Sequence, residues 1–156
     1  MDEELARRIA SARHKGQLDR SGRPMIDHLR RVAAAVPARA RSVAWLHDLY
    51  ERTPTRPAEL RFRGLDQVEA AALKLLTRGG DEDYALHIWR IASAVGDAGV
   101  LARLVKLADL EDHLASPAAA HSSSPPYAWA RHVLVAVNAE LERRSQAVAS
   151  AQQRAS

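Results

Sequence analysis

Residues 43–51 form the run Val-Ala-Trp-Leu-His-Asp-Leu-Tyr-Glu, which places His47 and Asp48 inside an otherwise apolar helical segment. Adjacent side chains on a helix diverge by about 100°, so this polar pair lies beside the apolar face of the helix and not opposite it. Buried polar groups need partners, and a charged group is especially costly to bury alone. We therefore expect His47 and Asp48 to meet other polar groups inside the fold.

Two further segments carry a polar residue in an apolar helical context. Asp109 follows Leu-Val-Lys-Leu-Ala within the stretch ARLVKLADLEDHL at 102–114, and His28 interrupts an apolar stripe of its own. Each has a simple structural explanation. A lone histidine on an apolar face is more often a hydrogen-bonded core residue than a ligand, and Asp109 can pair with a neighbour such as Lys106.

The combination of two histidines and two aspartates favours a metal site. The chain has no cysteine, which excludes disulfide scaffolds, cysteine nucleophiles, cysteine-ligated zinc and iron–sulfur clusters. Any metal site must therefore use histidine, carboxylate and water. Such ligand sets suit Mn²⁺, Fe²⁺ or Zn²⁺.

The composition predicts a single all-α domain. The chain has 156 residues, of which 47% are hydrophobic and 27% charged, a balance typical of one globular domain. Ala, Leu and Arg are abundant while aromatic residues make up 4%, which favours helices. We expect a compact multi-helix bundle over residues 1–144 and a polar, frayed tail over 145–156, with the three tryptophans, Trp45, Trp89 and Trp129, in the core.

Apolar periodicity and helix-breaking residues divide this domain into seven or so helices. We expect them near 3–14, 24–36, 38–52, a short piece before Gly64, 66–78, a helix containing Tyr84 and Ile91, 98–115 and 127–144. Asp66 and Glu69 match a capping box, and Asp81 is a plausible cap for the helix containing Tyr84. Residues 116–126, rich in Ser and Pro, are expected to form a loop.

The charge balance favours an anionic partner. There are 23 basic and 19 acidic residues, giving a formal net charge of +4, which suits a nucleotide as well as a nucleic acid. No recognition motif supports nucleic-acid binding, so we rank it as unlikely. The charged N-terminal stretch lacks the apolar run of a signal peptide, and charges interrupt every candidate membrane span. We expect a cytoplasmic protein that makes no use of a membrane.

The chain resembles the HD superfamily of metal-dependent phosphohydrolases through the pattern His28, His47-Asp48 and Asp109. It is most similar to the hydrolase domain of the Rel/Spo alarmone enzymes and their small stand-alone relatives. Five segments in unbroken order carry this likeness. The first runs from Ala10 or Ala12 to Ala33 and contains HKGQLDRSGRPMIDHLRRVA. The others are WLHDLYERT at 45–53, LTR at 76–78, VKLADLEDHL at 105–114 and YAWARHVLVAVNAELE at 127–142.

The resemblance implies a fold, a metal and a reaction. His28, His47, Asp48 and Asp109 are expected to hold one divalent ion, most often Mn²⁺ in this family. Such an ion lowers the pKa of bound water from about 16 toward 7, and family members use it to remove the 3′-pyrophosphate from ppGpp. Glu51 matches the catalytic glutamate that orients or deprotonates the attacking water.

Several positions depart from the family pattern. The usual Glu-Asp pair is Glu51-Arg52, so that Arg52 either clamps a phosphate at the catalytic site or faces solvent. His113 replaces an asparagine that contacts the nucleotide, and Met25 replaces a tyrosine. The basic residues expected to bind substrate, together with His113, are Lys15, Arg20, Arg23 and Lys106. Tyr84 and His87 lie where family members place substrate contacts, although a core role is favoured for Tyr84.

These departures concern the substrate pocket and not the proposed metal ligands. One hypothesis is a stand-alone Mn²⁺-dependent phosphohydrolase acting on ppGpp or a related phosphorylated nucleotide. The alternative is a degenerate HD module that binds metal or nucleotide without hydrolysis. The sequence leaves the metal, the substrate and the oligomeric state open.

Overall fold

The predicted all-α class is confirmed. The structure, a computed structural model, describes residues 1–116 and 126–154, and no strand occurs in these ranges apart from an isolated bridge between Leu18 and Pro24. The helices in chain order are α1 (Glu3–Arg13), α2 (Met25–Ala35), the 3₁₀ helix η1 (Ala38–Ala40), α3 (Arg41–Leu46), α4 (Leu49–Arg52), α5 (Pro57–Phe62), α6 (Gln67–Leu76), α7 (Tyr84–Ser93), α8 (Gly96–Leu114) and α9 (Tyr127–Arg154).

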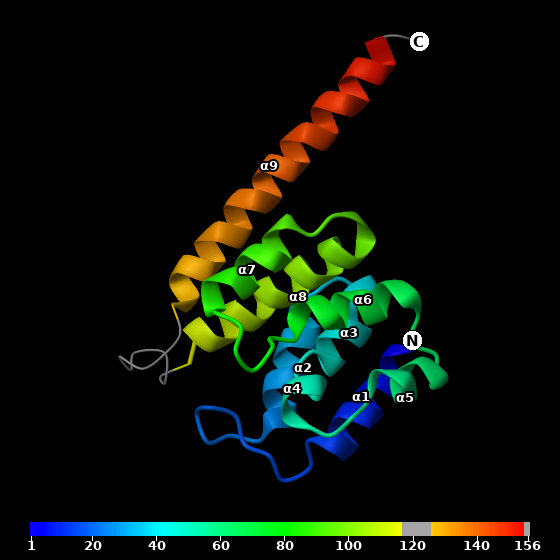
Figure 1. The fold of residues 1–156 in the computed structure, drawn as a ribbon, viewed down its shortest axis with the longest axis vertical. Helices are drawn as coiled ribbons and strands as arrows, with labels where there is room; N and C mark the ends of the chain where they lie inside the picture. The colour runs from blue at the N-terminus through cyan, green and yellow to red at the C-terminus, as the bar shows by residue number, and fades with distance from the viewer. Residues whose placement is uncertain (117–125, 155–156) are drawn as a thin grey trace.

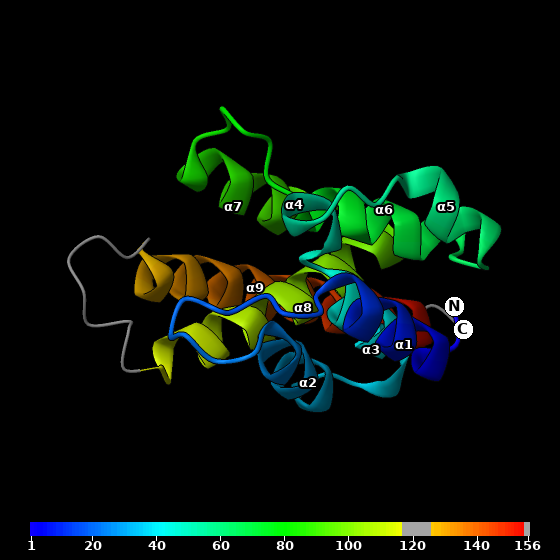
Figure 2. The same ribbon diagram turned by 90° about the horizontal axis from the view of Figure 1, so that it is seen from below.

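The helix α8 occupies the centre of the bundle. It packs against α2, α3, α6, α7 and α9, and it lies between the layer of α5, α6 and α7 and the layer of α1, α2 and α3 (Figure 2). A helix with neighbours on several sides is apolar around most of its circumference. Arg103 and Asp109 are nevertheless buried on α8, so each must find compensating partners within the fold.

The third predicted helix is divided at His47 and Asp48. We expected one helix over 38–52, but the structure has η1, α3 and α4, with His47 and Asp48 between α3 and α4. Asp48 has φ −90° and ψ −2°, a sparsely populated backbone region in which many active-site residues lie. The chain keeps a near-helical course, since the Arg52 N–H donates to the Asp48 carbonyl at 3.0 Å.

Local side chains set the starts of α6 and α7. The capping box at α6 is confirmed: the Asp66 carboxylate accepts the Glu69 N–H at 2.8 Å, and the Glu69 carboxylate accepts the Asp66 N–H at 3.0 Å. At α7 the predicted cap was wrong. Asp83, not Asp81, accepts the first free N–H groups of the helix, because Asp81 lies two residues too early to reach them.

The last helix is longer than predicted. The helix α9 continues to Arg154 and projects beyond the rest of the molecule (Figure 1), so the tail expected to fray from residue 145 is helical through 154. No Gly or Pro interrupts 128–154, and its Ala, Gln and Arg residues favour helix. Tyr127, Ala130 and Leu134 are buried against the body, while every residue over 141–153 is exposed.

The tryptophans divide between core and surface. Trp45 is buried as expected, but Trp89 and Trp129 are 51% and 37% exposed, so the core assignment was wrong for both. They lie on the outward faces of α7 and α9. The expected loop at 116–126 falls mostly on 117–125, outside the described residues. No helix in the described part of the chain is long and apolar enough to cross a membrane.

Candidate metal centre and adjoining cavity

Three helical segments far apart in sequence bring histidines and aspartates together. The helix α2 supplies His28, the junction of α3 and α4 supplies His47 and Asp48, and α8 supplies Asp109 and His113. His28, His47 and Asp109 are buried, whereas Asp48 and His113 are partly exposed. The helices α2, α3 and α8 pack directly on one another, so the core that holds the bundle together also fixes the spacing of these side chains.

The three imidazoles converge on one carboxylate oxygen. Oδ1 of Asp109 lies 3.1 Å from Nε2 of His113, 3.4 Å from Nε2 of His28 and 3.7 Å from Nε2 of His47. Oδ1 of Asp48 lies 3.5 Å from Nε2 of His47. Neighbouring ligands around one ion with bonds of about 2.1 Å are roughly 3.0–3.4 Å apart. The separations of His113 and His28 from Asp109 lie in this range, and the two that involve His47 are slightly longer, so these atoms are close enough to become ligands of a shared cation.

The far sides of two imidazoles are held by acceptors. Nδ1 of His28 lies 2.8 Å from the Asp112 carboxylate, and Nδ1 of His47 lies 2.8 Å from the Ala44 carbonyl oxygen. Because both partners accept, each Nδ1 carries a hydrogen, and in the neutral imidazole each Nε2 is the nitrogen left to bind a metal. The two Nε2 atoms face each other at 3.4 Å. Once both rings are neutral, a cation between these two nitrogens would bind both lone pairs, so the donor set fits a divalent metal.

The buried charges perturb one another strongly. Burial opposes ionisation of Asp109, but Lys106 and the three histidines outweigh it and hold the pKa of that carboxyl well below its usual range. Nζ of Lys106 lies 2.9 Å from Oδ2 of Asp109. Burial also opposes the charged form of His47, yet Asp48 and Asp109 raise its pKa to about 9. Both aspartates are therefore available as anionic ligands, whereas His47 must release a proton before it binds metal.

A cavity of about 270 Å³ adjoins this cluster. It is lined by Arg20, Asp48, Glu51, Arg52, Arg78, Tyr84, His87, Lys106, Asp109, His113, Pro126 and Tyr127. Four of these side chains are cationic, which favours a ligand with several negative charges. The Tyr127 ring stacks on His113 with ring centroids 4.8 Å apart, and the Arg20 guanidinium lies 6.0 Å from the Tyr127 centroid.

The two residues at the end of α4 are held in different ways. Glu51 lines the cavity, and its carboxylate accepts the N–H of Arg78 at 2.5 Å. Arg52 also lines the cavity, and its Nε lies 3.1 Å from Oδ2 of Asp48. The backbone of the loop between α6 and α7 thus fixes one oxygen of Glu51, while Arg52 neutralises the outer oxygen of a candidate metal ligand.

The structure gathers most of the residues singled out from sequence. His28, His47, Asp48 and Asp109 form one cluster, and His113, expected to touch substrate, joins it. The cavity collects Arg20, Glu51, Arg52 and Lys106, together with Tyr84 and His87, so Tyr84 is not a plain core residue. Lys15 and Arg23 do not line it. Lys15 is exposed on the loop after α1, and Nε of Arg23 pairs with Asp19 at 3.5 Å.

Sequence reasoning missed four residues at this site. Asp112 binds His28, and Arg31 donates to both Asp112 oxygens; Arg78 and Tyr127 line the cavity. Asp112 follows Asp109 by three residues and so lies near it on the same helix face, which is a usable signal. The sequence carries no comparable signal for Arg78 or Tyr127, because their positions depend on how α7 and α9 pack.

No protein-family model matches the chain, and no curated protein matches it either. The fold and the site together define the class of protein: it is an all-α bundle with a buried His/Asp cluster that could hold a metal ion.

Proposed function

We propose that this protein is a Mn²⁺-dependent phosphohydrolase of the HD type, which removes the 3′-pyrophosphate from ppGpp or from a related phosphorylated nucleotide. The observation that carries the proposal is the adjacency of two features. Three imidazole Nε2 atoms approach Oδ1 of Asp109, and this cluster opens onto a cavity lined by four cationic side chains. A metal cluster beside an anion pocket suits hydrolysis of a phosphate ester.

We assign the ion to His28, His47, Asp48 and Asp109, with His113 within reach of Asp109. Their potential ligand atoms form two sets that share His28, namely His28, Asp109 and His113, and His28, His47 and Asp48. Nitrogen and carboxylate ligands together suit Mn²⁺, with water completing the coordination. When bound, such an ion acts as a Lewis acid that makes water acidic enough to supply hydroxide near neutral pH.

The remaining residues bind and orient the substrate. Arg20, Arg52, Arg78 and Lys106 line the cavity and neutralise phosphate charge, since guanidinium groups bind phosphate oxygens in a bidentate manner. Glu51 lines the cavity with one oxygen fixed by the Arg78 N–H, so its other oxygen is free to accept the proton of the attacking water. We therefore assign Glu51 as the general base.

The test compares metal-stripped protein with and without Mn²⁺, following GDP and pyrophosphate released from ppGpp by anion-exchange chromatography. We expect release only with Mn²⁺ and its loss in Asp48→Ala, whereas Asp27→Ala, a change at a partly exposed residue one position before His28, keeps activity. In Glu51→Gln we expect a rate lower by about 10²–10⁴-fold with Mn²⁺ still bound, and Glu59→Gln serves as its control. Full activity in Asp48→Ala would exclude the assigned site.

The second candidate is a degenerate HD module that binds metal or nucleotide without hydrolysis. The ion pair between Arg52 and Asp48 favours it, because the guanidinium competes with a metal for that carboxylate. It predicts that Mn²⁺ and ppGpp bind while no pyrophosphate is released. It also predicts that Arg52→Asp, which restores the acidic pair of the family, creates activity absent from the natural chain.

A further inference from the structure

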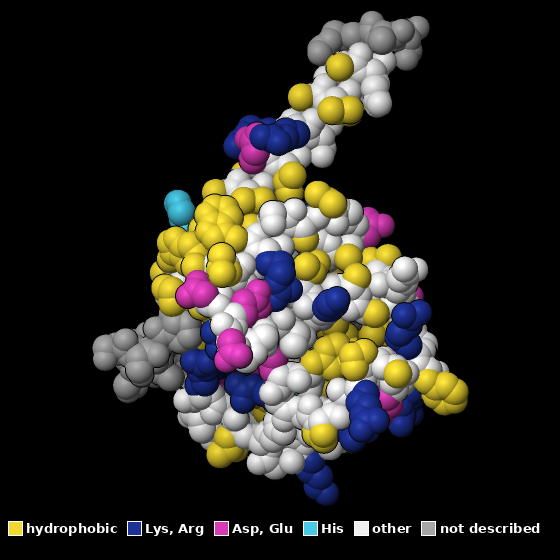
Figure 3. Space-filling view, in the orientation of Figure 1, with side chains coloured by type: hydrophobic (Ala, Val, Ile, Leu, Met, Phe, Trp, Pro, Cys, Tyr) yellow, Lys and Arg dark blue, Asp and Glu magenta, His cyan; other side chains and the backbone are white. Residues whose placement is uncertain are grey.

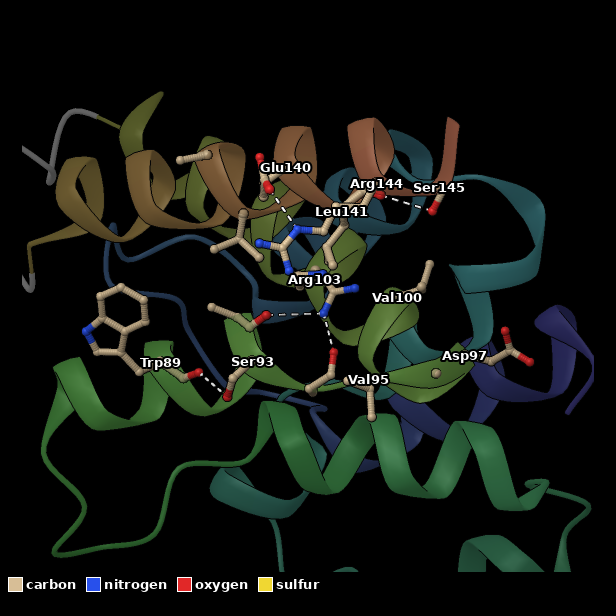
Figure 4. A pocket seen from close by; sticks show the side chains of 15 residues that line it. Trp89, Ser93, Val95, Asp97, Val100, Arg103, Glu140, Leu141, Arg144 and Ser145 are labelled. Carbon is tan, nitrogen blue, oxygen red and sulfur yellow. Dashed lines mark hydrogen bonds and ion pairs between the residues drawn. The ribbon is translucent and has the colours of Figure 1, made fainter. Parts of the chain in front are cut away.

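A second cavity lies away from the metal centre, between the end of α7, the start of α8 and the middle of α9. Its volume is about 690 Å³, within the range of small-molecule sites. It shares no lining residue with the cavity beside the metal cluster. Its walls are Trp89, Ala92, Ser93, Ala94, Val95, Gly96, Asp97, Val100, Arg103, Ala136, Val137, Glu140, Leu141, Arg144 and Ser145 (Figure 4).

The walls of this cavity are largely apolar and open to solvent. Trp89 is 51% exposed, Val95 87% and Leu141 37%. Hydrophobic side chains also gather over α7 and the adjoining part of α9 on the face seen in Figure 3. Contiguous exposed apolar surface of this kind marks a site where a ligand or partner binds.

A buried guanidinium forms the polar part of the site. Arg103 is only 4% exposed; its Nε donates to Asn138 at 2.9 Å and its Nη1 to the carbonyls of Ala94 at 2.5 Å and Ala92 at 3.4 Å. Its Nη2 has no partner among the described residues. Among the described residues, the fully buried side-chain atoms without a partner belong to His14, Trp45, Tyr50 and Tyr84. Nη2 of Arg103 therefore keeps some accessible surface, and Arg103 lines the cavity.

The charge of Arg103 also lacks a counter-ion, as a comparison with Arg90 makes clear. Both guanidinium groups bind carbonyls at the end of a helix, Arg90 at α6 and Arg103 at α7. Arg90 is neutralised by Glu82 at 2.8 Å. Arg103 forms no ion pair within the described ranges, and its partners there are neutral. A buried charge without a counter-ion is costly, and an anionic ligand would remove that cost.

The other charges at this site do not supply the missing anion. Glu140 is held by Arg144 at 2.7 Å and by Arg143 at 2.8 Å, as the dashed line to Arg144 shows in Figure 4. Asp97 is exposed in the first turn of α8. The anion that Arg103 lacks must therefore come from outside the described chain.

We infer that this cavity binds a carboxylate with an unbranched apolar body, such as a medium-chain fatty acid. The carboxylate accepts hydrogen bonds from the free Nη2 of Arg103 and gains a full charge partner, and hydrogen bonds between two charged groups are stronger than those between neutral groups. The hydrocarbon chain lies along the surface formed by Trp89, Val137 and Leu141. This assignment is independent of the metal centre and of the proposed hydrolysis.

The test is isothermal titration of the full chain with decanoate, using 1-decanol as the neutral probe of matched length. We expect one decanoate per chain, bound at least about tenfold more tightly than decanol because only the acid gains the charge-assisted bonds. Mn²⁺ is omitted, so failure of the proposed hydrolysis has no bearing on the result. Equal affinity for both probes, or no binding of decanoate at millimolar concentration, would overturn the assignment.

Variants locate the site. Leu141→Glu adds a negative charge to the exposed wall and should weaken decanoate binding at least about tenfold. Leu86→Glu, at an exposed leucine of α7 outside the cavity, should leave binding unchanged. Arg103→Gln should bring the affinity for decanoate down to that for decanol. If the Arg103→Gln variant does not fold, the comparison of Leu141→Glu with Leu86→Glu still tests whether decanoate binds in this cavity. A natural chain that sediments as a dimer, becomes monomeric in Leu141→Glu and binds no decanoate would instead show that a second copy covers this surface.

Discussion

His28 is bonded through both ring nitrogens, and the two bonds serve different purposes. Its Nδ1 is fixed by Asp112, which Arg31 holds in turn through both carboxylate oxygens. Its Nε2 is thereby directed toward His47 and Asp109. A ligand whose second nitrogen is held in this way is oriented before the metal arrives, which lowers the entropy cost of binding.

Removal of the acceptor behind His28 should therefore weaken metal binding. In Asp112→Ala we expect the affinity of the metal-stripped protein for Mn²⁺ to fall about 10–100-fold, measured by calorimetric titration. Glu111→Ala is the matched control, since Glu111 is exposed at the preceding position of α8 and pairs with Arg131 instead. Equal affinities in the two variants would contradict a role for Asp112 in orienting His28.

At the level of residues, a polar site residue can be predicted from sequence when its sequence neighbours are apolar, and it is missed when they are polar. His28, His47, Asp48 and Asp109 were predictable because each interrupts an apolar helix pattern. Asp112 escapes notice because it lies in the polar stretch Glu-Asp-His, where a solvated carboxylate is the ordinary expectation. Loop residues are harder to place from sequence. Lys15 and Arg20 lie in the same loop between α1 and α2, but only Arg20 lines the cavity. Helical periodicity carries no information about the path of a loop.

Among the elements, the end of α6 depends on a side chain from α7. Arg90 donates to the carbonyls of Lys74, Leu75 and Thr77, which have no partners within their own helix. It also pairs with Glu82, and this hydrogen bond lowers the pKa of Glu82 to about 2. One guanidinium thus joins α6, the following loop and α7, next to the cavity lined by Arg78.

Replacement of Arg90 should loosen this junction. In Arg90→Met we expect the free energy of unfolding to fall by about 1–3 kcal/mol, because partly buried carbonyls lose their donors. The measurement is urea denaturation followed by circular dichroism. Lys74→Met is the control: it removes an exposed cation from the same helix end but leaves the carbonyl contacts in place. A loss as large in Lys74→Met would show that charge, and not the carbonyl bonds, is responsible.

The helix boundaries that sequence predicts well are those set by neighbouring residues. The capping box of Asp66 and Glu69 is local, so its residue types at a three-residue spacing are sufficient to identify it. The interruption between α3 and α4 is not local. Residues 38–52 contain no helix-breaking Gly or Pro, and the break at His47 and Asp48 falls where α3 packs against α2 and α8. The periodicity of one segment carries no information about its contacts with other helices.

For the molecule as a whole, the projecting half of α9 contributes little to the stability of the bundle. Its exposed residues after Arg144 bury no side chain against the body. We expect a chain that ends at Arg144 to unfold within about 0.5 kcal/mol of the full chain, with a smaller helical signal, as measured by urea denaturation. A loss of several times that size would mean that 145–154 are covered in solution, by a second copy or another partner.

Acid should destabilise the bundle through His87, which is 2% exposed beside the cavity. Burial, reinforced by Lys106 and Arg90, lowers its pKa to about 4 from the ordinary value of 6.5. Between these two pH values the unfolded chain binds a proton at His87 and the folded chain does not, so the free energy of unfolding falls as pH drops from 6.5 to 4.

In His87→Gln this contribution to the pH dependence is absent. The free energy of unfolding of the natural chain, relative to the variant, should therefore decrease by up to about 3 kcal/mol between pH 7 and pH 4. Parallel pH profiles for the two proteins in urea denaturation would show that His87 is protonated as easily in the folded state as in the unfolded one.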